Sequence, residues 1–221
     1  MPAEVKNFNE ELYTHEFISN LYDEGFMSRN WEHKRQQNLN LARLMYEHFK
    51  PKNVIDFGCG IGSYLEVFKS NGCDVRGFEY GYDAAKTQYD KVGLTEEEIT
   101  FGDVTKQISV DKKYDLAVCI EVAEHIPTNK SDVLIDNILN SINDDGHIFF
   151  TAALPGQGGT GHINCQPKSF WIDKFMQRGW VLAEEHKCIT KNMIPVAQPS
   201  EDLNSVWVWV YNNFEIYKKT K

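Results

Sequence analysis

The stretch VIDFGCGIGSYLEVF, residues 54–68, reads as a short apolar run, a glycine-rich turn and the start of an amphipathic helix. A buried strand, a tight turn and a helix form the first unit of an alternating α/β fold. The glycines Gly58, Gly60 and Gly62 are spaced G-x-G-x-G, whereas the dinucleotide fingerprint is G-x-G-x-x-G. The lysine of a phosphate-binding loop is missing too. The turn therefore indicates a ligand without a phosphate group.

Beyond this stretch, strands and helices are predicted to alternate. The predicted strands are 54–58, 74–80, 99–104, 114–122, 147–154, 180–188 and 205–218, and the predicted helices are 39–49, 63–72, 83–92, 130–143 and 169–179. This order predicts an α/β, Rossmann-like doubly wound sheet that is mostly parallel. No helix is predicted between the last two strands, so they are expected to pair antiparallel at one edge. Residues 1–50 are expected to form an N-terminal helical cap, and residues 51–221 the sheet domain.

Composition narrows the class of protein. The chain has 221 residues, a net charge of −9, 42% hydrophobic and 25% charged residues, which is ordinary for a soluble globular protein. An acidic chain repels a phosphate backbone, so no nucleic-acid partner is expected. No apolar run is long enough to span a membrane. The five cysteines form no CxxC pair and no secretory signal is apparent, which predicts free thiols and a cytoplasmic location.

Three acidic residues end three successive predicted strands. Asp56 precedes the glycines, Glu79 follows 23 residues later, and Asp103 closes the third strand. Parallel strands bring their carboxyl ends to one edge, where ligands bind. There Asp56 suits an ammonium group, Glu79 can accept both hydroxyls of a ribose, and Asp103 can meet an adenine amino group. Each acid alone could instead cap the helix that follows it.

The ordered segments VIDFGCGIG, GFEYGYDA, FGDV and YDLAVCIEVAEHIP resemble the class I S-adenosylmethionine-dependent methyltransferases over roughly residues 50–155. The resemblance implies S-adenosylmethionine as the methyl donor and S-adenosylhomocysteine as the product. It also implies that the glycines admit the methionine part of the donor, that Cys59 packs between them and that Glu79 binds the ribose. The other residues predicted to border the donor are Asp56, Tyr80, Asp103, Val104, Ile120 and, for its carboxylate, Arg29.

An alcohol acceptor must lose a proton during methyl transfer, so a positioned base is expected. The segment EVAEHIP, 121–127, and the loop AALPGQGGTGHINCQP, 152–167, supply the candidates. His162 is the predicted general base, with His125 or Glu121 next; both histidines could instead brace their loops. A divalent ion held by these residues and Glu124 is conceivable, but the spacing does not demand one and no metal is predicted.

The acceptor is predicted from the same loop. Gln157, Asn164, Trp31 and Trp171 are the candidate acceptor-binding residues, although Trp171 could equally pack a core helix. The pattern PGQGGTGHIN followed by SFWIDKF resembles methyltransferases of surface sugars such as rhamnose.

The predicted function is therefore methylation of a hydroxyl on a sugar or glycan. Two alternatives stay open: a small phenol or quinol acceptor, because EVAEHIP also resembles quinone-pathway enzymes, and a non-catalytic donor-binding module. The chain could also be one domain of a longer glycan-building protein, and its oligomeric state is not predicted.

Overall fold

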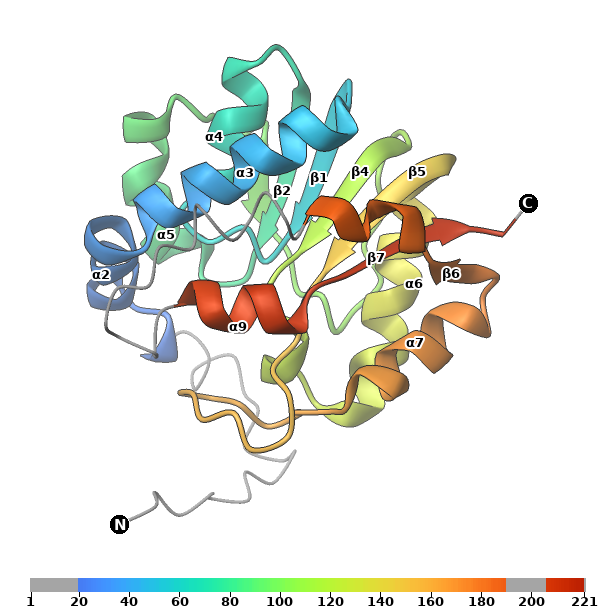
Figure 1. Ribbon diagram of the computed structural model, residues 1–221. Coiled ribbons are helices and arrows are strands. Elements are labelled where there is room, and N and C mark those ends of the chain that lie inside the picture. Colours follow the sequence, from blue (N-terminus) through green and yellow to red (C-terminus); the bar gives the residue numbers. More distant parts are fainter. Residues whose placement is uncertain (1–19, 190–205, 221) are drawn as a thin grey trace.

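The computed structural model describes residues 20–189 and 206–220, leaving aside the side chains at 29–33, 187 and 206–208. These residues form a seven-stranded sheet in the order β3-β2-β1-β4-β5-β7-β6 (Figure 1). Strands β1 to β5 are parallel to one another, whereas β7 runs antiparallel to both β5 and β6. The predicted doubly wound sheet with an antiparallel edge is confirmed.

The strands are short and mostly buried. Their bounds are β1 (Asn53–Phe57), β2 (Asp74–Glu79), β3 (Ile99–Phe101), β4 (Tyr114–Cys119), β5 (Ile142–Phe150), β6 (Trp180–Leu182) and β7 (Glu215–Lys219). The strand order reverses between β1 and β4, and ligands of open α/β sheets bind at such a point.

Helices cover both faces of the sheet. The α-helices are α2 (Glu24–His33), α3 (Arg35–Phe49), α4 (Ser63–Ser70), α5 (Tyr82–Tyr89), α6 (Ser131–Ser141), α7 (Lys168–Met176) and α9 (Val206–Asn213), and the 3₁₀ turns are η2 (Asp90–Val92), η3 (Ala123–His125), η4 (Thr128–Lys130) and η5 (Glu184–Cys188). Helices α3, α4 and α5 cover one face, and α6 and α7 cover the other (Figure 1).

Alternation along β1 supplies both cores. Val54 belongs to the hydrophobic cluster under α3 and α4, while Ile55 and Phe57 belong to the cluster under α6 and α7. Because Asp56 alternates with Ile55 and Phe57, its carboxylate lies on the α4 side of the sheet, directly before the glycine turn. The strand period thus fixes on which face the first of the predicted acids lies.

The described part of the predicted cap packs on the sheet domain. Met27 of α2 and Leu41 and Met45 of α3 are buried in the same cluster as Val54. The chain before residue 20 lies outside the described residues, so the boundary between residues 50 and 51 stays a prediction.

The prediction for residues 205–218 was wrong in its first half. The alternating apolar residues of VWVWV favour a strand, but α9 occupies 206–213 and only β7 is extended. The helix buries Val210 in the core and turns Asn213 toward Gln157, whose side-chain oxygen accepts its hydrogen bond at 2.8 Å. These tertiary contacts override the local β-propensity. A helix therefore stands between the last two strands, contrary to expectation.

The strand predicted for 180–188 is shorter than expected. It ends at Leu182, although the N–H of Ala183 still donates to the carbonyl oxygen of Ile216 in β7 at 2.8 Å. The chain then turns into η5. Among the described residues, no helix combines the length and the apolar character that a membrane crossing requires.

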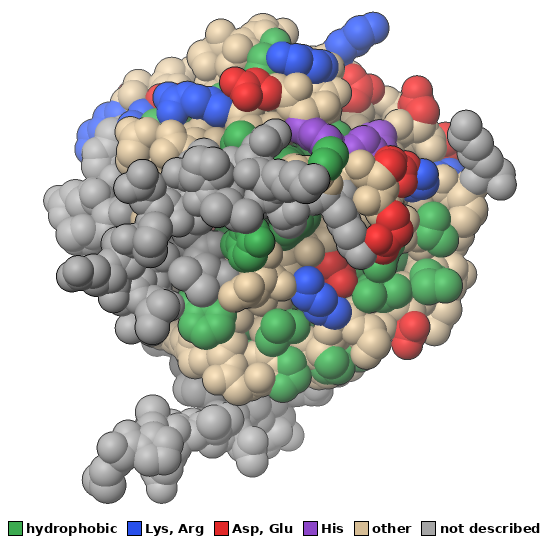
Figure 2. Space-filling view, viewed as in Figure 1, with side chains coloured by type: hydrophobic (Ala, Val, Ile, Leu, Met, Phe, Trp, Pro, Cys, Tyr) green, Lys and Arg blue, Asp and Glu red, His purple; other side chains and the backbone are tan. Residues whose placement is uncertain are grey.

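Three histidines join α3, β5 and η5 on the surface shown in Figure 2. His48 Nε2 lies 2.7 Å from Nδ1 of His186, and His186 Nε2 lies 3.0 Å from Nε2 of His147. A neutral imidazole donates through one nitrogen and accepts through the other, so three neutral rings can form this chain. Burial lowers the pKa of each of the three rings, and the nearby charge of His186 lowers those of His48 and His147 further.

We expect acid to destabilise the fold through this chain. The pKa of each ring is lowered in the folded state, so as the pH falls through about 6.5 the unfolded chain takes up protons first. Stability present above that pH is then lost, although Glu185 opposes the change at His147 and His186. The thermal midpoint should fall between about pH 7.5 and 5.5, and less steeply in His186→Asn. Equal slopes for the two proteins would contradict this role.

Candidate functional site

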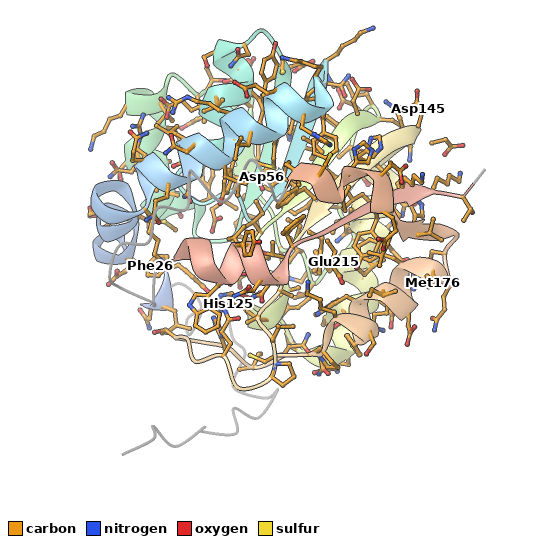
Figure 3. All side chains as sticks on the ribbon, in the orientation of Figure 1. Phe26, Asp56, His125, Asp145, Met176 and Glu215 are labelled. Carbon is orange, nitrogen blue, oxygen red and sulfur yellow. The ribbon has the colours of Figure 1, made fainter. Side chains whose placement is uncertain are left out.

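A cavity of 440 Å³ lies at the carboxyl ends of the strands. Its wall combines the glycine turn after β1, the ends of β2 and β4, the turn after β3, the loop after β5, and residues of α2, α3 and α9. Phe26 and His125 lie at this end of the molecule, far from Asp145 at the opposite end of β5 (Figure 3). The cavity thus occupies the position expected for the ligand.

The glycine turn needs glycine for a steric reason. Gly58, Gly60 and Gly62 have φ angles of 76°, 53° and 79°, which disfavour any other residue. A Cβ atom on Gly58 would lie 2.5 Å from Cγ2 of Val122, whereas one on Gly60 would meet nothing within 4 Å. Gly58 lets the turn pack against the segment after β4, and Gly60 leaves open space. Gly58 and Gly60 line the cavity, whereas Gly62 does not.

Glu79 braces the glycine turn while lining the cavity. Its two carboxylate oxygens accept hydrogen bonds from the backbone N–H groups of Gly60 and Gly81, each at 2.7 Å. Burial raises the pKa of Glu79, and these two N–H donors oppose the rise. The carboxylate keeps lone pairs with which it can accept ligand hydroxyls.

Asp56 lies beneath the turn and not in the cavity wall. It is 1% exposed, its Oδ2 atom has no partner among the described residues, and Ser63 Oγ nearby in sequence also lacks one. Burial and then the charge of Glu79 raise the pKa of Asp56 well above its usual range. This place fits a part in holding the turn better than the predicted contact with an ammonium group.

The remaining predicted donor residues lie along the cavity wall. Cys59, Tyr80, Asp103, Val104 and Ile120 all line it. Asp103 follows β3 in a turn instead of ending the strand, because β3 stops at Phe101. Its Oδ1 atom accepts hydrogen bonds from the N–H and the hydroxyl of Thr105. Cys59 is a buried free thiol, and burial raises its pKa well above the usual value.

Glu121 begins the segment after β4 in a left-handed conformation, with φ of 54°. Thr151 accepts a hydrogen bond from its N–H and donates one to its Oε1, both at 2.8 Å. Gln157 donates to Oε2 at 3.2 Å and accepts from Asn213 of α9. The carboxylate is therefore fixed by the loop after β5, and both Glu121 and Gln157 line the cavity.

His125 and His162 meet at the cavity wall. Their rings form an edge-to-face pair with centroids 4.8 Å apart. His125 Nδ1 lies 3.3 Å from the carbonyl oxygen of Gly161, so Nδ1 donates and Nε2 keeps its lone pair. Burial and then His162 lower the pKa of His125 to about 3. Burial also lowers the pKa of His162, so both rings are neutral near pH 7.

Glu124 is the buried partner of this pair. It is 0% exposed, and His162 Nε2 lies 4.0 Å from its Oε1 atom. Its backbone oxygen accepts the N–H groups of Ile163 and Asn164, each at 2.9 Å, which docks the loop after β5 on η3. Burial, and then the charge of Glu121, raise the pKa of Glu124 well above its usual range.

Two predicted acceptor contacts are wrong. Asn164 is 1% exposed and does not line the cavity; its amide donates to Ala123 and Ser131 and so braces the loop. Trp171 is 2% exposed and packs on Phe150 in the core. An aromatic residue on a helix can pack in a core or line a site. Trp171 packs in the core because it lies on the face of α7 that is turned toward the sheet. Arg29 and Trp31 lie on α2, but their side chains lie outside the described residues.

Several residues of the cavity wall were not among the predicted site residues, and three of them bear on the chemistry. Lys34 lies between α2 and α3, and burial lowers its pKa while Glu121 opposes the change. Tyr22 packs edge-on to His125 at 5.7 Å, and Trp209 comes from α9. Because residues 205–218 were predicted as a strand at the edge of the sheet, Trp209 was not expected in the cavity wall. One feature of the sequence could have indicated Lys34. It is a cation that directly precedes helix α3, whose buried face packs on the sheet.

Comparisons with known proteins agree with this geometry. A protein-family model described as a methyltransferase domain matches residues 26–194. The chain is similar to the ubiquinone biosynthesis O-methyltransferases of Glaesserella parasuis serovar 5 (31% identical over 125 residues, 51% of this chain and 52% of the relative) and Pectobacterium atrosepticum (29% over 142 residues, 58% and 57%). The chain thus spans about half the length of the curated relatives it matches.

Solved structures share the fold. An O-methyltransferase from a trans-AT PKS multienzyme of Brevibacillus brevis, in complex with S-adenosyl-L-homocysteine, gives a TM-score of 0.55 at 16% identity, with 84% of this chain and 72% of that chain covered. A TehB-like SAM-dependent methyltransferase from Corynebacterium glutamicum gives 0.54 at 21% identity, with 82% and 88% covered. Both likenesses concern the fold alone.

The contact between Gly58 and Val122 yields a prediction. Gly58→Ala should weaken binding of S-adenosylhomocysteine at least about 10-fold, because the turn must move away from its left-handed geometry and from Val122. Gly72→Ala is the matched control, since Gly72 also has a positive φ of 83° but meets nothing within 4 Å. It should lose about 1–2 kcal/mol of stability through backbone strain and keep its affinity. Calorimetry that finds both variants equally impaired in binding would contradict the steric argument.

Proposed function

This chain belongs to the methyltransferase domain family, and on that premise we propose that it transfers the methyl group of S-adenosylmethionine to a hydroxyl of a small ring-shaped acceptor, with a sugar as the first acceptor class. The observation that carries the proposal is the single cavity that joins the glycine turn and Glu79 to Glu121, His125 and His162. A donor on the turn and an acceptor beside the histidines would meet inside it.

The donor's charges match the cavity wall. Glu79 can accept hydrogen bonds from the ribose hydroxyls, and Asp103 with Val104 can border the adenine. Lys34 is the described cation of this wall, and its partial burial next to Glu121 favours a bound carboxylate. We assign Lys34 to the carboxylate of the donor's methionine part, the role predicted for Arg29.

Lys34→Met tests this assignment. The variant should bind S-adenosylhomocysteine about 10-fold more weakly or worse, the loss expected when a charge-assisted hydrogen bond is removed. It should bind methylthioadenosine, which lacks the amino-acid part, as the parent chain does. Calorimetric titration with both compounds measures the two affinities. Equal weakening for both compounds would show that Lys34 supports the cavity and does not contact the carboxylate.

The chemical step is a direct displacement. The acceptor oxygen forms its bond to the methyl carbon while the bond from that carbon to sulfur breaks, which leaves S-adenosylhomocysteine. The hydroxyl proton goes to a base, and His162 is the base we assign, because its ring is neutral, lines the cavity and lies 4.0 Å from the Glu124 carboxyl group. His125 and Glu121 are the second candidates for the base.

The acceptor class follows from the need for this base. An aliphatic hydroxyl such as that of a sugar is a far weaker acid than a phenol, so it depends more on a positioned base. The histidine pair and the buried carboxyl group of Glu124 support such an acceptor, and Gln157 offers an amide for its hydroxyls. A phenol or quinol is the second candidate. It is favoured by the aromatic side chains Tyr22, Phe26 and Trp209 in the wall and by the names of the curated relatives.

Transfer of labelled methyl groups tests the function. Labelled S-adenosylmethionine would be offered with deoxysugar-containing oligosaccharides, phenols, quinols, peptides and nucleic acids. Label on a sugar supports the first acceptor class, and label on a phenol or quinol supports the second. Donor binding without label on any hydroxyl compound would contradict the proposal and favour the non-catalytic alternative.

His162→Ala tests the base. It should retain its affinity for S-adenosylhomocysteine and lose turnover by about 10²–10⁴-fold, the usual contribution of a general base. His186→Asn, at the opposite end of the sheet, is the matched control and should keep its turnover. A His162→Ala variant with the turnover of the parent chain would remove His162 from the mechanism.

A further inference from the structure

Three potential metal ligands meet in the wall of the cavity. One ligand atom each from Glu124, His125 and His162 lies within 4.8 Å of the other two. We infer that these three residues form a binding site for one divalent transition-metal ion. The ion's identity is set by chemistry: two imidazoles and one carboxylate suit Zn²⁺, Mn²⁺ or Fe²⁺, whereas Mg²⁺ prefers oxygen ligands.

The carboxylate of Glu124 points to a cation. Both of its oxygens are buried and have no hydrogen-bond partner among the described residues. Glu121 and the backbones of Glu124 and Ala153 influence its pKa, but none of them forms a hydrogen bond with either oxygen. A buried carboxyl group without partners is costly, and buried charges are normally paired or coordinate metals. A bound cation would satisfy both oxygens and relieve the repulsion between Glu124 and Glu121.

Both imidazoles are already oriented by second partners. His125 donates from Nδ1 to the Gly161 carbonyl, which leaves Nε2 free to ligate. The Nδ1 atom of His162 lies 3.7 Å from Sγ of Cys165, which itself donates to the backbone oxygen of Gln157. Metal-binding histidines almost always donate their other ring N–H to such a group, which fixes the tautomer and the ring plane.

The loop geometry serves the same cluster. Ligand atoms around a tetrahedral ion at about 2.1 Å lie about 3.4 Å apart, so atoms that are up to 4.8 Å apart here must close by up to about 1.4 Å. Gly159 lets the loop run directly against His162, because a Cβ there would lie 2.2 Å from Nε2 of that ring. Three protein ligands leave open positions on the ion, the arrangement of catalytic and not of structural sites.

What the ion does rests on the proposed function, whereas its binding does not. An ion at the cavity wall would contact the acceptor's hydroxyl, or two adjacent hydroxyls of a sugar, and make the hydroxyl proton more acidic. The lone pair of His162 then belongs to the ion, so the proton would go to Glu121, which also lines the cavity. The bonds formed and broken at the methyl carbon are unchanged.

Metal binding can be measured without turnover. Chelator-treated protein would be titrated with Zn²⁺ by calorimetry and with Co²⁺ by visible absorption, which reports the ligand set. We expect one ion per chain, and an affinity at least about 100-fold lower in Glu124→Gln and in His162→Ala, since even second partners of a ligand contribute about 10–100-fold. Binding of S-adenosylhomocysteine would confirm that each variant is folded.

The surface histidines provide the control. His48, His147 and His186 could bind Zn²⁺ adventitiously, so His186→Asn should leave the tight site intact. The inference is overturned if no ion binds tightly, or if His186→Asn abolishes binding while Glu124→Gln does not. Full-rate methyl transfer after chelation would overturn the role given to the ion in the reaction, and would leave the binding site and the proposed function standing. A tightly bound ion without methyl transfer to any hydroxyl compound would overturn the proposed function alone.

Discussion

The close approach of Gly58 to Val122 is the contact on which the site depends. Gly58 has no Cβ, so the turn after β1 can lie against the segment after β4, where a methyl group would collide with Val122. Gly58 and Cys59 also donate their N–H groups to the carbonyl of Phe78 in β2. One turn is thereby held against its two neighbouring strands. The glycine turn and the segment after β4 share a wall of the cavity because of it.

The part of the cavity that we propose for the acceptor depends on a second constraint, the docking of the loop after β5. The backbone oxygen of Glu124 accepts two N–H groups of that loop, and Asn164 ties it to Ala123 and Ser131. This fixes His162 beside His125 and buries the Glu124 side chain. The backbone oxygen of Glu124 is thus hydrogen-bonded to the loop, while its two side-chain oxygens have no partner among the described residues. Unpaired buried polar atoms of this kind are typical of ligand-binding sites.

The sequence predicts those parts of the fold that local pattern controls. The strand–turn–helix around Gly58, the parallel order and the place of Glu79 follow from periodicity and glycine spacing. Trp209 and the function of Asn164 could not be predicted, because each depends on contacts between segments far apart in the chain. Residues 206–213 have strand-like alternation, yet the burial of Val210 and the bond from Asn213 to Gln157 make them a helix. Trp171 shows the converse error, since an aromatic residue suits both a core and a site.

The central claim is that the donor's methyl group points at the histidine pair. Magnetic resonance can test this directly, using S-adenosylmethionine labelled with ¹³C at the methyl group and protein labelled at its histidine rings. The account predicts a nuclear Overhauser effect from the methyl protons to the ring of His162 or His125, and none to His186 at the other end of the sheet. A bound donor whose methyl group shows no contact with either cavity histidine would contradict it.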